Sequence, residues 1–213
     1  MIGKSPAAPP WEAWLAPVVV AVGGACLALA CANLPPHELD DLCAIFGQKT
    51  EWRAAALRAE ERWGTPVPVL MAVLHQESRF RARAQPDWRF VLGVVPLGPA
   101  SSAYGYGQVK EATWDDYRRL ARRPEARRDR FADVVDFVGW YADLIERVTG
   151  VAKQDAYHLY LAYHEGPAGF ERRSFEGKPW LLGVARKVEE RAVLYGRQQG
   201  QCIGPALAAA PVP

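Results

Sequence analysis

Glu77 is the residue whose type and position offer the clearest chemistry. Leu70, Leu74 and Glu77 are spaced i, i+4 and i+7 in a hydrophobic run, so on a helix the carboxyl continues an apolar stripe. Burial disfavours the charged form of a carboxyl and raises its pKa toward neutrality. A carboxyl that keeps its proton near pH 7 is an acid able to cleave an acetal.

The same position allows a plainer interpretation. Arg79, Arg81 and Arg83 follow Glu77 closely, and a glutamate at a helix end can form an ion pair with such neighbours. Periodicity alone favours neither the acid nor the ion pair.

Three short segments add to this pattern. They read HQESRF at 75–80, SSAYGYGQ at 101–108 and AYHEG at 162–166. In this order and spacing they resemble the lytic transglycosylase (SLT) family of lysozyme-like folds, whose members carry an E-S opening, a G-L-M-Q loop and an A-Y-N-x-G element. The resemblance covers roughly residues 65–195.

The resemblance implies a set of site residues in this chain. Glu77 matches the catalytic acid. The residues expected to contact substrate are Ser78, Ser102, Tyr106, Gln108 and Tyr163. The chain departs from the family pattern with Tyr106-Gly107 for Leu-Met and His164 for Asn, and an insertion leaves open whether Ser101 or Ser102 is the loop serine.

The implied reaction is cleavage of the β-1,4 bond between N-acetylmuramic acid and N-acetylglucosamine in peptidoglycan, without net hydrolysis. Glu77 would protonate the leaving oxygen and then accept a proton from the muramoyl 6-hydroxyl, which leaves a 1,6-anhydro end. Such an enzyme is a carbon-oxygen lyase. Tyr163 would orient Glu77 or polarise the acetamido group, while Gln108 and the loop serine would bind the sugar.

Two other functions compete with this one. A lysozyme-type muramidase on the same fold usually needs a second carboxylate, and the candidates are Glu165, Asp87, Asp115 and Asp116. A non-catalytic envelope lipoprotein could instead keep the fold to bind peptidoglycan or a partner protein. The joint presence of Glu77, Gln108 and Tyr163 argues against the second alternative.

Aromatic and basic side chains offer further contacts. Aromatic rings cover pyranose faces well, and the candidates are Trp88, Tyr104, Tyr106 and Trp114; each could equally pack in the core. Seven arginines crowd residues 118–130 and could contact anionic envelope polymers or be a solvated helix end. His75 points elsewhere on its helix than Glu77.

The elements that must position these residues are mostly helices. Helical periodicity or stop signals predict helices over 51–63, 66–78, 111–121, 131–148, 153–164 and 180–195. Valines among glycines and prolines predict a long loop or hairpin insertion over about 85–107. The expected fold is mainly α, a lysozyme-like SLT-domain helical fold with this one insertion.

Composition excludes several classes of protein. The 213 residues are 50% hydrophobic and carry a formal net charge of +2, which is globular and too balanced for a nucleic-acid partner. We expect no metal and no cofactor, because the sequence holds no zinc-type ligand spacing and no Gly-rich phosphate loop. A monomer that binds peptidoglycan glycan strands is expected.

The N-terminal segment resembles an export signal. Residues 14–30 are uncharged and apolar but short for a membrane span, and Leu27-Ala28-Leu29-Ala30-Cys31 resembles a lipobox, which makes Cys31 the expected lipidation site. An ordinary cleaved signal and an uncleaved anchor are the alternatives. The expected location is the periplasmic side of a bacterial cell envelope, with a lipid anchor in the membrane.

The domain boundaries follow from these segments. We expect an export signal over 1–30, a linker with a first short helix over 31–50, the transglycosylase domain over 51–202 and a flexible tail over 203–213. After export, with Cys26 lost in the signal and Cys31 lipidated, the remaining cysteines are Cys43 and Cys202, at the two ends of the domain. In an oxidising compartment they are expected to form a disulfide. Two unrelated buried thiols are the alternative.

Overall fold

The computed structural model describes the backbone of residues 34–91 and 95–202, and the side chains in these ranges except those of 88–99. Contacts divide the chain into two units, Met1–Leu34 and Pro35–Pro213, and the second contains every described helix and strand. The predicted signal, Cys31 and the tail over 203–213 lie outside the described residues. None of the helices described is long and apolar enough to cross a membrane.

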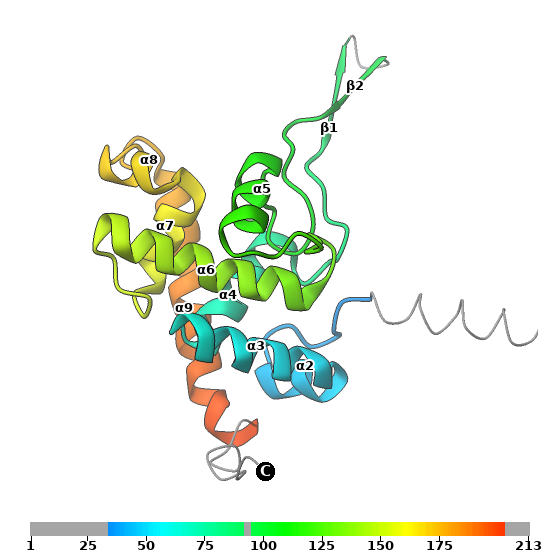
Figure 1. Ribbon diagram of the computed structural model, residues 1–213, viewed down its shortest axis with the longest axis vertical. Helices are drawn as coiled ribbons and strands as arrows, with labels where there is room; N and C mark the ends of the chain where they lie inside the picture. Colours follow the sequence, from blue (N-terminus) through cyan, green and yellow to red (C-terminus); the bar gives the residue numbers. More distant parts are fainter. Residues whose placement is uncertain (1–33, 92–94, 203–213) are drawn as a thin grey trace, which may run out of the picture. The chain divides into compact units, whose positions relative to one another are not determined.

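Helices dominate the described part of the chain, as Figure 1 shows. In order along the chain they are α2 (Leu42–Gln48), α3 (Thr50–Trp63), α4 (Val67–Ser78), α5 (Glu111–Leu120), α6 (Phe131–Thr149), α7 (Ala156–Glu165), α8 (Pro167–Glu171) and α9 (Pro179–Cys202). This confirms the mainly α fold that the sequence predicts.

Local signals account for several of the helix ends. Gly64 and Gly150 end α3 and α6 in the left-handed conformation, with φ of 72° and 75°, which glycine adopts without strain. Helix α7 begins three residues later than predicted, because the Asp155 side chain caps it by accepting a hydrogen bond from the His158 N–H. The short helix α8 was not predicted.

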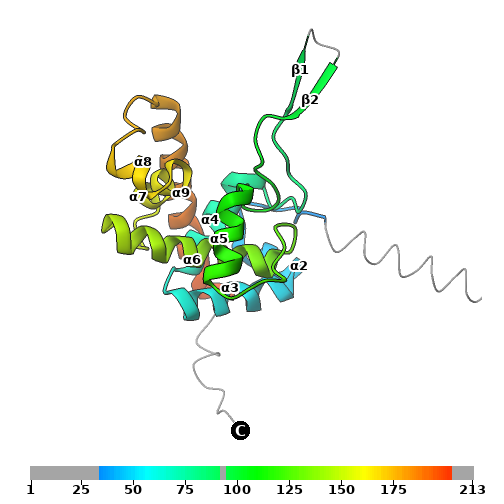
Figure 2. The same cartoon turned by 45° about the horizontal axis from the view of Figure 1, so that its top comes forward.

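The insertion contains a β-hairpin. Strand β1 (Trp88–Val91) pairs antiparallel with β2 (Val95–Pro99), with Trp88 opposite Pro99 and an irregular register after Arg89. In Figures 1 and 2 the two strands extend away from the helices. The hairpin lies within the predicted 85–107 insertion.

Helix α4 is the centre of the core. It contacts α3, α6 and α9, and all its residues except Gln76 and Glu77 are buried. Because so apolar a helix is surrounded by others, its C-terminal end is held firmly where Glu77 emerges. Beside it, the rings of Trp52 and Phe131 stack with centroids 4.1 Å apart.

Two buried aspartates on α6 tie together three helices. Asp136 accepts hydrogen bonds from Tyr117 Oη at 2.6 Å and Trp63 Nε1 at 2.9 Å, and Asp133 forms an ion pair with Arg123 at 3.0 Å. Others of the 118–130 arginines pair with nearby aspartates: Arg118 with Asp115, Arg119 with Asp116, and Arg127 with Asp129. These arginines therefore have structural partners within the domain.

Helices α2 and α9 are joined covalently. Cys43 and Cys202 form a disulfide with Cα atoms 5.3 Å apart. The Leu42 N–H also donates to Gln198 Oε1 at 2.9 Å, and Ile45 is fully buried. The folded unit thus starts before residue 51, the boundary expected from the sequence, because α2 belongs to the core.

Candidate active site

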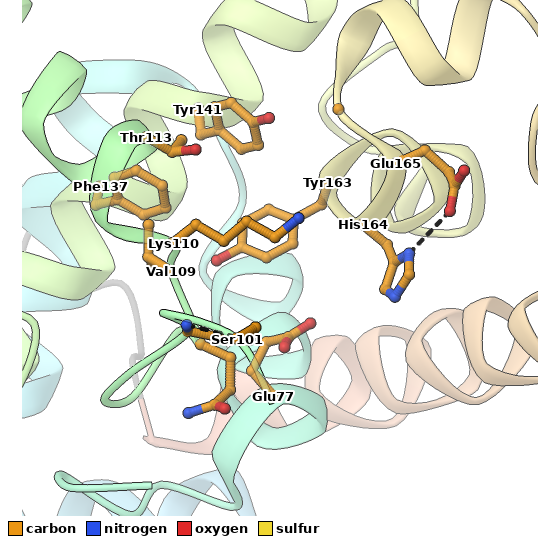
Figure 3. A pocket seen from close by; sticks show the side chains of 13 residues that line it. Glu77, Ser101, Val109, Lys110, Thr113, Phe137, Tyr141, Tyr163, His164 and Glu165 are labelled. Carbon is orange, nitrogen blue, oxygen red and sulfur yellow. Dashed lines mark hydrogen bonds and ion pairs between the residues drawn. The ribbon is translucent and has the colours of Figure 1, made fainter. Parts of the chain in front are cut away.

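A cavity of about 590 Å³ opens at the C-terminal end of α4. We call it the Glu77 cavity; Figure 3 shows its lining side chains. They come from α4, the 101–110 loop, α5, α6, α7 and the turn after α7: Glu77, Ser101, Ala103, Gln108, Val109, Lys110, Thr113, Phe137, Tyr141, Tyr163, His164, Glu165 and Gly166. The three segments singled out in the sequence therefore meet at one place.

Glu77 is surrounded by protein on most sides and faces the cavity on the other. This burial raises the pKa of its carboxyl from 4.5 to about 7, and a hydrogen bond from the Tyr160 hydroxyl limits the rise. Arg79, Arg81 and Arg83 form no ion pair with it in the described structure, and Arg81 donates to the Ser78 carbonyl oxygen instead. The carboxyl therefore keeps its proton at a much higher pH than an exposed glutamate does.

Two tyrosines of α7 have different partners. Tyr160 donates its hydrogen bond to the Glu77 carboxyl, whereas Tyr163 donates to the Gly107 carbonyl oxygen at 2.8 Å. The Tyr160 hydroxyl therefore lowers the pKa of the acid, whereas the Tyr163 hydroxyl binds the loop. The i, i+3 spacing of the two tyrosines was a signal that both share one helix face, but it did not show which one reaches Glu77.

The 101–110 loop is held by backbone contacts. Gly105 has a φ of 79°, and a Cβ there would collide with the Arg128 carbonyl oxygen, so only glycine fits. Gln108 Nε2 donates to the carbonyl oxygens of Ala84 and Gly105, both at 2.9 Å. Part of the amide of Gln108 thus holds the loop, while its side chain also lines the cavity.

Arg128 is a positioning residue that the sequence did not single out. Its Nη1 donates to the carbonyl oxygens of Ser102 at 2.8 Å and Val109 at 2.9 Å, at the two ends of the loop. The guanidinium also lies over the Tyr104 ring at 5.3 Å from its centroid. The sequence could not distinguish Arg128 from the other arginines of the 118–130 run.

Four of the predicted substrate contacts need correction. Ser78 is 2% exposed and donates to the Leu74 carbonyl oxygen, so it is a helix residue turned inward. Tyr106 is 2% exposed and packs edge-on against Trp52 and Phe131. Trp114 is also buried. Ser101 lines the cavity, whereas Ser102 Oγ accepts a hydrogen bond from the Glu111 N–H.

The other aromatic candidates are less informative. Tyr104 does not line the cavity and lies under Arg128, and the Trp88 side chain is outside those described. His75 is a buried residue of α4. Its burial, and to a smaller extent the positive charge of Arg191, lower its pKa to about 4. It is therefore neutral at pH 7 and faces away from the cavity, as the sequence predicts.

Glu165 is the second carboxylate at the cavity, and its oxygens are fully engaged. Lys178 Nζ donates to both, at 2.7 and 2.9 Å, Ser174 donates to Oε2, and His164 Nδ1 lies 3.0 Å from Oε1. Burial raises its pKa, but these hydrogen bonds outweigh burial and lower the pKa to about 2. Glu165 is therefore held as a carboxylate, with both oxygens occupied by these contacts.

The remaining acidic candidates lie elsewhere. Asp87, Asp115 and Asp116 are exposed and do not line the Glu77 cavity. In the part of the chain that the structure describes, no group of three or more His, Cys, Asp and Glu side chains could hold a metal ion. The cavity therefore presents one carboxyl able to exchange a proton near neutral pH.

Comparison with known proteins agrees with this geometry. Residues 19–202 match the family described as Transglycosylase SLT domain, which is most of the chain. No curated protein and no solved structure gives a significant match. Because the family match spans all the described helices and the residues that form the cavity, the chain belongs to the transglycosylase SLT domain family.

Proposed function

We propose that this protein is a peptidoglycan lytic transglycosylase that uses Glu77 as its only acid and base. The observation that carries the proposal is that two carboxyl groups line one cavity and differ in their environment. The Glu77 carboxyl has a pKa of about 7, whereas the Glu165 carboxylate forms an ion pair with Lys178. The first can donate and accept a proton at neutral pH. The second can do neither.

The reaction then involves two proton transfers, both at the Glu77 carboxyl. Protonated Glu77 gives its proton to the glycosidic oxygen as the bond from that oxygen to C1 of N-acetylmuramic acid breaks. The 2-acetamido group or ring oxygen shares the positive charge that develops at C1. The Glu77 carboxylate next takes the proton of the muramoyl 6-hydroxyl, whose oxygen bonds to C1. The products are a free 4-hydroxyl and a 1,6-anhydro end, and no water is consumed.

A muramidase reaction has less support. Hydrolysis by inversion needs a second carboxylate as a base for water, and retention needs one as a nucleophile. Glu165 has both oxygens occupied by Lys178, Ser174 and His164. The described residues that line the cavity include no other acidic side chain.

The test is product analysis with Glu77→Gln. The amide keeps the shape of the side chain but exchanges no proton, so we expect the release of anhydro-muropeptides to fall by at least ~10²- to 10⁴-fold. Glu61→Gln is the matched control, because Glu61 is exposed on α3 and does not line the cavity. Mass spectrometry of digested peptidoglycan separates anhydro ends from reducing ends. Reducing ends from the unaltered protein would contradict the proposal.

We further propose that the protein is a lipoprotein on the periplasmic side of the cell envelope. The support is the apolar segment over 14–30, which Cys31 follows directly, and a disulfide in the folded unit, because disulfides persist in exported proteins. Cells fed a labelled fatty acid should label the protein but not a Cys31→Ser variant. An unlabelled, exported protein would exclude the lipid anchor and leave the enzymatic proposal intact.

A further inference from the structure

The region just outside the Glu77 cavity contains a tryptophan that the core does not use. Trp180 is 58% exposed. It lies in the first turn of α9, whose buried residues are Leu181, Ala185, Val188, Ala192 and Tyr195. Trp180 falls beside this stripe, so the packing of α9 does not explain a large apolar side chain at this position.

Trp180 is linked to the cavity by its contact with His164. The two rings meet edge to face, with centroids 5.3 Å apart and planes at 78°, and His164 lines the cavity. Such a contact covers only part of an indole, which agrees with the exposure of Trp180. An aromatic face therefore lies next to the cavity wall and remains available to a ligand.

An ion pair joins the two chain segments that carry these rings. Lys178, two residues before Trp180, holds both oxygens of Glu165, and Glu165 is adjacent to His164 in the chain and 3.0 Å from its Nδ1 (Figure 3). Because Glu165 is ionised, it accepts this bond and Nδ1 carries the hydrogen. In the described structure His164 Nε2 has no protein partner, so it is free to bind a ligand.

We propose that Trp180 and His164 form a saccharide subsite that binds a sugar of the glycan strand at a distance from the bond that is cut. A pyranose has an apolar face of C–H groups and a rim of hydroxyls. The Trp180 ring matches the face, and His164 Nε2 matches a hydroxyl of the rim. The subsite rests on the proposed function, since the same strand fills the Glu77 cavity, and it makes long strands better substrates than short ones.

The test compares strand lengths in Trp180→Ala. The substrates are peptide-free glycan strands of two and of at least four disaccharide units. We expect kcat/KM on the long strands to fall about tenfold and kcat/KM on the short strands to stay within twofold. Trp180→Phe, which keeps an aromatic face, should retain most of the activity on long strands. Leu120→Ala is the matched control, because Leu120 is also 58% exposed but lies at the end of α5 instead of beside His164.

A binding measurement separates the subsite from catalysis. Isothermal titration of long strands into Glu77→Gln should show affinity about tenfold higher than titration into the Glu77→Gln, Trp180→Ala double variant. Equal affinities, or an equal loss on short and long strands, would overturn the subsite and leave Glu77 as the acid. Continued cleavage by Glu77→Gln would instead overturn the proposed function.

Discussion

Glu77 is held between two opposing influences. Burial at the end of α4 favours the neutral carboxyl, while the hydrogen bond from Tyr160 favours the charged one. The result is a pKa of about 7, at which the side chain can both give and take a proton at neutral pH. A fully solvated glutamate would already be ionised and could not start the reaction.

Tyr160→Phe tests this balance. Without the hydroxyl, the charged form of Glu77 loses its hydrogen bond and its pKa rises. The alkaline limb of the pH profile of kcat/KM should therefore move to higher pH, and kcat should fall because the carboxyl is less well oriented. Tyr163→Phe is the comparison: its hydroxyl binds Gly107, so it should lower activity without that shift of the alkaline limb.

The same pKa makes folding stability depend on pH. The folded-state pKa of Glu77 is raised from 4.5 to about 7, so between these values the folded protein keeps a proton that the unfolded chain has released. Stability from this group is complete below about pH 4.5 and is lost as the pH rises to about 7.

Glu77→Gln removes this dependence. We expect the variant to be more stable than the unaltered protein at pH 8, by roughly 2–3 kcal/mol, and of similar stability at pH 4. Urea unfolding at the two pH values measures the difference. Equal stabilities at pH 8 would show that Glu77 is not desolvated.

At the scale of elements, the wall of the cavity depends on the short loop between the hairpin and α5. Arg128, from the segment before α6, bonds to carbonyl oxygens at both ends of this loop, and the Tyr106 N–H donates to the Arg128 carbonyl oxygen at 3.2 Å. Gly105 makes that close approach of the two backbones possible. The loop is therefore a fixed part of the site.

Gly105→Ala tests the close approach, with Gly150→Ala as its control. Both glycines have a positive φ, but an added Cβ has open space at Gly150 and meets the Arg128 backbone at Gly105. Gly150→Ala should lose only the ~1–2 kcal/mol of the left-handed conformation. Gly105→Ala should lose more and should also lower kcat/KM, because the loop must shift. Equal losses in denaturant unfolding would contradict this account.

At the scale of the whole folded unit, α9 connects the start of the fold to the site. Its first turn carries Trp180, near His164, and its last residue is the disulfide partner Cys202. The bond spans a sequence separation of 159 residues. In the chain-entropy model, closing a loop of that length stabilises the fold by about 5 kcal/mol.

Reduction should therefore lower the melting temperature, by roughly 10 °C or more. A Cys43→Ser, Cys202→Ser double variant should melt at the temperature of the reduced protein and should not respond to reductant. Activity at 25 °C should change little, since the bond does not touch the Glu77 cavity. Two thiols that can be alkylated in the untreated, exported protein would contradict the expected pairing.

The sequence alone indicated most of the helices and, through the three segments that resemble the SLT family, the candidate acid. The helices depend on local patterns, namely the period of apolar residues and the glycines at helix ends, whereas the spacing that leads to Glu77 left its role open between an acid and an ion pair. Side-chain roles in the core were less accessible. Tyr106 is an aromatic residue of a type that often stacks on sugars, but Trp52 and Phe131, which are distant in the chain, bury it.

Only the tertiary structure decided which neighbours each polar group meets. It showed that the Tyr160 hydroxyl lowers the pKa of Glu77 and that Glu165 forms an ion pair with Lys178. It also showed that Ser101, not Ser102, lines the cavity. It also brought Arg128 to the loop and Trp180 to His164. The physical reason is that such contacts join residues from different elements, and their hydrogen bonds and ion pairs depend on distances that no local periodicity encodes.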